Sequence, residues 1–174
     1  MEFDLKKSVE VLERTPLVLQ SMLGGLDQGW TSNNEGGESW SPYVVMGHLI
    51  HGEKTDWIPR VEIILSNEAD KHFVPFDRFG QLRSNSQQTL PQLLAEFAIL
   101  RKEGMDTLKS KKISAVDLAK KGIHPEFGEV TLAQLLAAWT VHDLGHIVQI
   151  SRVMAKQYTL AVGPWTRYLS ILSK

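Results

Sequence analysis

A stripe of apolar side chains that also carries two histidines runs through the C-terminal part of the sequence. Its members follow one another at intervals of three or four residues: Leu132, Leu135, Trp139, His142, His146, Gln149 and Val153. This interval matches the 3.6-residue period of an α-helix, so these side chains share one face that can pack against a core. We therefore expect a long helix that is capped by Thr131, ends near Gln157 and directs two histidines inward.

Three further segments show the helical period and predict three more helices. They cover residues 5–23, 42–66 and 90–112. Pro16 follows Thr15, a capping residue type, so the first helix is expected to continue through a turn that tolerates proline. Pro59 lies inside the second segment, where proline removes a backbone hydrogen bond, and we expect a bend there.

The segments between these helices are polar and irregular. Residues 24–40 are rich in turn formers, and residues 67–88 lack a regular period, so both are predicted as long connections, the second of which could cover a site. Residues 124–128 indicate a turn, and Gly163-Pro164 separates a short C-terminal helix. Strand signals are weak. We predict an all-α fold, a four-helix bundle forming one domain over residues 1–174, with a helix order that periodicity leaves open.

Composition excludes several classes of partner. Lys and Arg number 19 against 20 Asp and Glu, without a basic cluster, so nucleic acid is not expected. No apolar run approaches the roughly 20 residues of a membrane-spanning helix, and the N-terminus lacks the pattern of a signal peptide. We therefore expect no membrane partner and a cytoplasmic location. Because cysteine is absent, thiolate ligands and a cysteine nucleophile are excluded, and any thiol chemistry needs a small-molecule thiol.

The two histidines of the stripe lie four residues apart and can bind one metal ion from adjacent helix turns. A third ligand is expected from His48, which shares the apolar side of the second helix with its neighbours. His51 is the alternative ligand, although its surroundings in the sequence place it nearer to solvent. His72 and His124 lie in predicted connections, so an ordinary solvated or turn-stabilising role explains them.

The predicted metal ligands are thus His48, His142 and His146. Three imidazoles leave coordination positions open for water, as in catalytic metal sites, whereas a structural zinc site is normally closed by four protein ligands. Zn²⁺ and Ni²⁺ are the leading candidates, and Fe²⁺, Mn²⁺ and Cu²⁺ also accept imidazole. Asp143 could orient a ligand from behind, or equally could form an ion pair on the helix flank.

Other polar and aromatic residues of the expected helices have ordinary structural explanations. Glu53 and Asp56 are interpreted as surface charges in preference to general bases. Four tryptophans are interpreted as packing groups of the core and the bundle ends: Trp40, Trp57, Trp139 and Trp165. The sequence therefore assigns no catalytic residue.

Two segments resemble the DinB-like superfamily. They run from Trp40-Ser41-Pro42 through Gly47-His48-Leu49, and from Val130-Thr131-Leu132 through His142-Asp143-Leu144-Gly145-His146-Ile147-Val148-Gln149-Ile150. The order of elements agrees over nearly the whole chain. The resemblance implies a bundle of the DinB/YfiT-like type, whose three metal histidines match His48, His142 and His146. Known branches include thiol S-transferases that use bacillithiol or mycothiol-type cofactors, and proteins described as metal-dependent hydrolases.

Two main hypotheses of function follow. The first is a metal-dependent enzyme acting on a small-molecule substrate, either by activating water for hydrolysis or by activating a low-molecular-weight thiol for S-transfer. The second is a metal-binding or stress-response protein without catalysis, because no acid, base or substrate clamp stands out. A structural bundle that binds only adventitious metal is a third explanation. A homodimer is kept open among the partners.

Overall fold

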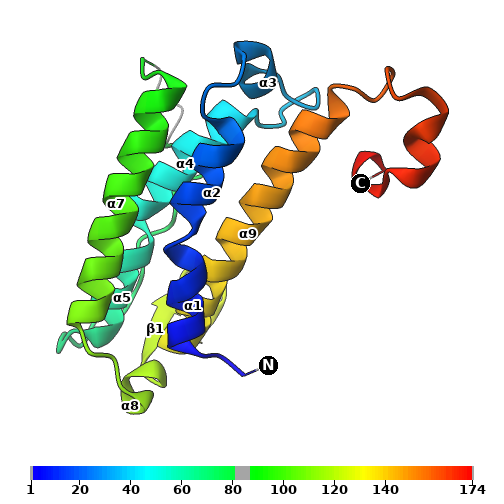
Figure 1. Ribbon diagram of the computed structural model, residues 1–174. Helices are drawn as coiled ribbons and strands as arrows, with labels where there is room; N and C mark the ends of the chain where they lie inside the picture. Colours follow the sequence, from blue (N-terminus) through cyan, green and yellow to red (C-terminus); the bar gives the residue numbers. More distant parts are fainter. Residues whose placement is uncertain (1, 81–86, 174) are drawn as a thin grey trace.

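The computed structural model describes residues 2–80 and 87–173, most of which are helical (Figure 1). In chain order the elements are α1 (Leu5–Leu12), α2 (Thr15–Leu23), α3 (Gln28–Ser32), α4 (Pro42–Thr55), α5 (Trp57–Leu65), α7 (Leu90–Ser110), α8 (Ala115–Leu118), β1 (Lys121–His124), β2 (Gly128–Thr131), α9 (Leu132–Lys156) and the 3₁₀ helices η1 (Gly163–Tyr168) and η2 (Ser170–Leu172). The predicted all-α fold class is confirmed. Among the described residues, no helix combines the length and apolarity needed to cross a membrane.

Four helical rods form the bundle, namely α1–α2, α4–α5, α7 and α9. The α1–α2 rod and α9 run in one direction, whereas the α4–α5 rod and α7 run in the other (Figure 1). Because α5 and α7 are consecutive rods with the same direction, the chain between them has to return along the length of the bundle. Periodicity left the helix order open, and the structure shows that it is a crossover arrangement. Residues 66–80 form the first part of the long connection that leads from the end of α5 back toward the start of α7.

The two N-terminal rods are each interrupted once. The first breaks at Glu13 and Arg14, so that Pro16 lies in the first turn of α2, where its missing N–H is not needed. The second breaks at Asp56, whose φ of −118° and ψ of −68° depart from the helix. The bend predicted at Pro59 is therefore misplaced, since this proline lies in the first turn of α5.

A β-hairpin precedes α9, and the sequence did not predict it. The predicted turn is present, because His124 pairs with Gly128 across a three-residue loop and Gly128 has a φ of 71°. Each strand has only four residues, too few for an alternating pattern to be recognised. Phe73 N donates to Ile123 O, and Ile123 N donates to Lys71 O, so the long connection is fastened to the hairpin.

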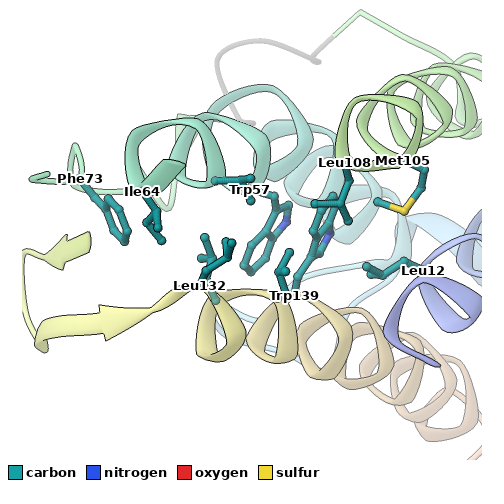
Figure 2. Close-up of a cluster of buried hydrophobic side chains, with 11 residues drawn as sticks. Leu12, Trp57, Ile64, Phe73, Met105, Leu108, Leu132 and Trp139 are labelled. Atoms are coloured by element: carbon teal, nitrogen blue, oxygen red, sulfur yellow. The ribbon is translucent and has the colours of Figure 1, made fainter. Parts of the chain in front are cut away.

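Apolar side chains fill the bundle in two clusters. In the first, the rings of Trp57 and Trp139 stack between α5 and α9 with their centroids 5.6 Å apart (Figure 2). The second cluster includes Leu49 of α4 and Phe97 of α7, two helices that pack against each other. Burial of such large side chains dominates the stability of a bundle. The packing role predicted for Trp165 is wrong, because this residue is 66% exposed.

One buried guanidinium joins all four rods. Arg101 of α7 is 1% exposed and donates to Glu53 of α4 and to Asp143 of α9, with N···O distances of 2.8 and 2.6 Å for the shortest bonds. Its Nη1 atom also donates to the carbonyl oxygen of Leu12 at the end of α1, at 2.8 Å. Such a network resists separation of the helices because separating its charges in a dry interior would leave them uncompensated.

The charges of this network stabilise one another. Burial by itself lowers the pKa of Arg101, but Asp143 and Glu53 reverse this effect and raise it above its ordinary value. Burial likewise tends to raise the pKa of Asp143, but its hydrogen bonds and Arg101 hold it below the ordinary value. Burial raises the pKa of Glu53 despite the attraction of Arg101. The guanidinium therefore remains charged, and both carboxylates depend on it.

We predict that Arg101→Met lowers the free energy of unfolding by about 3–5 kcal/mol, because two buried carboxylates then lose the cation that pairs with both of them. Lys102→Met is the matched control, since the neighbouring Lys102 forms an exposed pair with Asp106 and its loss is expected to have no measurable effect. Urea denaturation of the two variants measures the difference. Equal losses would contradict the role given to Arg101.

Candidate metal centre

The three predicted histidines converge on one point between α4 and α9. His48 Nε2 lies 3.1 Å from His142 Nε2, and His146 Nε2 lies 3.0 Å from the same atom. One ligand nitrogen from each ring lies within 4.8 Å of the other two. Two of the rings come from adjacent turns of α9, and the third comes from the facing side of α4, so the site depends on how these two rods pack.

Local sequence features start both helices at the right place. Ser41 Oγ accepts a hydrogen bond from Val44 N, and Pro42 occupies the first turn of α4. Thr131 forms a capping box with Gln134 at the start of α9. These caps define where each helix begins, and the helical period then places His48 and the α9 pair on facing surfaces.

The geometry of the three Nε2 atoms fits coordination of one metal ion better than hydrogen bonds between the rings. His146 Nδ1 donates to Gln149 Oε1 at 2.8 Å, so its Nε2 atom presents a lone pair to the cluster when the ring is neutral. His142 Nδ1 lies 3.9 Å from Asp143 Oδ1, beyond hydrogen-bond distance, and this buried nitrogen makes no hydrogen bond to a described residue. Nitrogens bound to one Zn²⁺ at about 2.0–2.1 Å lie roughly 2.9–3.4 Å apart. The donor set therefore fits a divalent ion.

Two of these imidazoles remain neutral well below pH 7. Burial, followed by the neighbouring His146 and His142, lowers the pKa of His48 to about 3. Burial and His142 lower the pKa of His146 to about 4, against a smaller opposing effect of the Gln149 hydrogen bond. Neutral imidazole is the form that binds a metal ion, so protons compete poorly at these two positions.

Aromatic rings enclose the cluster. The Trp40 and Phe76 rings lie 4.9 and 5.5 Å from the His48 ring, and Trp57 lies 5.1 Å from the His142 ring, between centroids. Phe76 belongs to the long connection, so part of this connection covers the histidine cluster; residues 81–86 lie outside the described part. Trp40 and Trp57, interpreted from sequence as packing groups, therefore also line the site.

The other histidines stay outside this cluster. The alternative ligand His51 packs against Phe76, with ring centroids 5.2 Å apart, and against Gly80. His72 is exposed and contacts Asp70 at 2.6 Å. His124 stacks on Phe127 at the hairpin tip, with centroids 4.4 Å apart. The ranking of His48 above His51 agrees with this geometry.

The acidic residues near the site are buried, and the surface role predicted for two of them is wrong. Glu53 and Asp56 are 8% and 7% exposed. Glu53 pairs with Arg101, and Asp56 pairs with Arg60, one turn later in α5. Asp143 is fully buried and contacts both Arg101 and, at 3.9 Å, the ring of a predicted ligand. It therefore combines an ion pair with the position expected of a ligand-orienting carboxylate.

Sequence reasoning missed Arg101 and Arg60, although a signal existed for both. Arg101 stands at helical spacing between Phe97 and Met105, in the middle of the apolar stripe of α7. A charge on such a stripe indicates a buried ion pair. Arg60 follows Asp56 by four residues, the spacing of a helical ion pair.

The histidine cluster opens into a cavity of about 1230 Å³. Besides α4 and α9, which carry the histidines, its walls include the segment before α4, the α4–α5 junction, part of residues 75–79 in the long connection, and residues 124–127 at the hairpin tip. This volume is somewhat larger than the roughly 300–1,000 Å³ of most small-molecule sites. The centre is therefore accessible to a ligand from one side and supported by the bundle on the other.

A solved structure supports the fold. YfiT from Bacillus subtilis, described as "a probable metal-dependent hydrolase with an unusual four-helix bundle topology", aligns with a TM-score of 0.73 over 88% of this chain and 86% of YfiT. The sequences are 18% identical, so this likeness establishes the bundle and its topology alone.

The remaining comparisons concern sequence. Among curated proteins, none matches the chain at a significant level. The model of the DinB superfamily matches residues 11–150, a range that includes all three clustered histidines, the whole of α4 and most of α9. This range covers most of the chain and confirms the resemblance seen in the sequence motifs. The protein is thus a member of the DinB superfamily.

Proposed function

We propose that His48, His142 and His146 bind a divalent metal ion and that the protein is a metal-dependent hydrolase of a small-molecule substrate. The observation that carries the proposal is the convergence of three Nε2 atoms from histidines that line a cavity of about 1230 Å³. Zn²⁺ or Ni²⁺ is the expected ion, and Fe²⁺ or Mn²⁺ suits the same ligands. The description of YfiT as a probable metal-dependent hydrolase supports this class of reaction.

A divalent ion with three imidazole ligands and an open coordination position lowers the pKa of water toward about 7, which makes a nucleophile available at neutral pH. The residues of the chain prepare the site for this chemistry. Gln149 holds the ring of His146 through its Nδ1 atom. Asp143, itself held by Arg101, supports the ring of His142. Trp40, Phe76 and Trp57 reduce the access of bulk water to the rings.

A second candidate is the transfer of a low-molecular-weight thiol to an electrophile. The cavity volume of about 1230 Å³ favours it, since two reactants fit there. The chain has no cysteine, so the sulfur nucleophile has to be supplied as a ligand. Its thiolate form is the reactive one.

The proposed ligand set predicts a sharp difference between two histidines that both line the cavity. His142→Ala is expected to abolish tight Zn²⁺ binding, whereas His124→Ala retains it, because His124 lies in the hairpin and outside the cluster. Zinc at 1,000 times its dissociation constant stabilises the natural protein by about 4 kcal/mol. Calorimetric titration and melting curves of untagged protein measure both effects. Equal losses in the two variants would show that the ligands are misassigned.

The lowered pKa values predict how the metal-free protein responds to acid. In the unfolded chain, His48 and His146 take up protons near their ordinary pKa of about 6.5, whereas in the folded protein their pKa values are lowered to about 3 and about 4. The unfolded state therefore binds more protons between about pH 6.5 and 4, and the free energy of unfolding decreases as the pH falls through this range.

Removing both imidazoles is expected to make this decrease shallower, by up to about 1.4 kcal/mol per pH unit for each histidine. The comparison uses chelator-treated natural protein and the double variant His48→Gln/His146→Gln, with urea denaturation between pH 7 and 4. His72→Gln is the control, because His72 is exposed and paired only with Asp70. Identical pH slopes for the natural protein and the double variant would refute the assignment of buried, neutral rings.

Activity assays distinguish the candidate reactions. Zinc-loaded protein is assayed with activated esters and amides, and separately with small thiols plus an electrophile. Hydrolysis that is lost in His142→Ala supports the proposal, and thiol consumption without hydrolysis supports the second candidate. If zinc binds tightly and neither reaction occurs over the panels, a metal-binding or stress-response role without catalysis is favoured.

A further inference from the structure

Arg60 lies in the same cavity as the histidines but has no place in the metal cluster. It belongs to the first turn of α5, lines the cavity and is 7% exposed. The same cavity wall includes Trp57 and the hairpin tip, residues 124–127. A cation buried at the wall of a cavity requires an explanation, because burial of a charge costs free energy unless partners compensate it.

The partners of Arg60 within the described chain leave much of its hydrogen-bonding capacity unused. Its Nη2 atom lies 2.7 Å from Asp56 Oδ1, yet this buried nitrogen makes no hydrogen bond to a described residue. The guanidinium carbon also lies 5.0 Å from the centre of the Phe73 ring. A guanidinium has five N–H donors in one plane, and a single carboxylate oxygen cannot satisfy them. Because Arg60 lines the cavity, a ligand bound there can supply further acceptors.

The ion pair with Asp56 orients the guanidinium of Arg60 and leaves it able to bind a second anion. Burial lowers the pKa of Arg60, and Asp56 opposes that shift. Burial in turn raises the pKa of Asp56, while Arg60 opposes that shift. An arginine held on one edge by a carboxylate and on one face by an aromatic ring keeps its other N–H groups in a defined direction. Such an anchored fork is suited to bind a second planar oxyanion.

The charge of the cavity indicates how many negative charges a ligand should bring. Its described wall carries three carboxylates and two guanidinium groups, from Glu38, Asp56, Glu126, Arg60 and Arg78. Together with a divalent ion on three neutral imidazoles, the site has a net charge of about +1, so it favours a ligand with one or two negative charges over a more highly charged one. A carboxylate meets this condition and matches the guanidinium in shape.

We propose that Arg60 forms a carboxylate-binding subsite, so that the substrate is a small carboxylic acid whose reacting group reaches the metal centre while its carboxylate binds Arg60. The inference rests on the proposed function for the metal centre and adds the substrate class. If Arg60 were only a structural partner of Asp56, its substitution would change stability and leave ligand affinity unaltered.

Binding measurements test the subsite without a known substrate. Zinc-loaded protein is titrated by calorimetry with acetate and with linear dicarboxylates from malonate to suberate. Acetate can use only one of the two positions, whereas a dicarboxylate of suitable length occupies both. We expect at least one dicarboxylate to bind about tenfold or more tightly than acetate, and we expect Arg60→Met to remove this advantage while zinc content and acetate affinity stay unchanged.

Two further variants keep the test decisive. Arg60→Lys retains the charge without the planar fork and is expected to lose most of the tighter binding of the dicarboxylate over acetate. This variant replaces Arg60→Met in the test if Arg60→Met does not fold. Arg152→Met is the matched control, because Arg152 pairs with Glu35 and does not line the cavity, and it should retain the full advantage. A phosphonocarboxylate of the best length is expected to bind no more tightly, since it adds a further negative charge.

Three results would overturn the subsite: no dicarboxylate exceeds acetate, the advantage survives in both Arg60 variants, or the phosphonocarboxylate binds more tightly through Arg60. These outcomes are separable from failure of the proposed function. Loss of zinc binding in the natural protein, or zinc binding without hydrolysis of any ester or amide, would refute the hydrolase. An Arg60-dependent dicarboxylate advantage would still establish the subsite.

Discussion

The contact of Arg101 with Glu53 and Asp143 is the interaction on which the arrangement of this bundle depends. It joins α7 to α4 and α9 in the dry interior, and its bond to the carbonyl oxygen of Leu12 adds α1. Apolar side chains attract helices without specifying their register, whereas a buried guanidinium has to meet its carboxylates in a defined geometry. This network therefore selects one register among the many that packing alone would permit.

That register has a direct consequence for the metal centre. Glu53 lies five residues after His48 on α4, and Asp143 directly follows His142 on α9. When Arg101 holds the two carboxylates, it also sets the distance between the helix surfaces that carry the histidines. Structural support and the chemistry of the site are thus coupled, because the residue that stabilises the bundle also positions the ligand-bearing helices.

The crossover of the chain provides the rest of the site. Since α5 and α7 run in the same direction, the connection between them has to travel along the bundle, and Phe76 covers two histidine rings on the way. The hairpin before α9 holds this connection through Ile123 and contributes residues to the cavity wall. Burial in the site, together with the neighbouring imidazoles, lowers the pKa values of His48 and His146 and keeps both rings neutral at pH 7. Loops that carry functional groups are characteristically supported by a rigid frame in this way.

The sequence by itself determined the helices, the pairing of His142 with His146 on one face and the choice of His48, because these follow from the helical period and local caps. Only the tertiary structure decided the crossover order, the hairpin, the break at Asp56 and the burial of Arg101 and Arg60. The physical reason is that periodicity reports which side of a helix is apolar, whereas the energy of a buried charge depends on partners that are distant in sequence and adjacent only after folding.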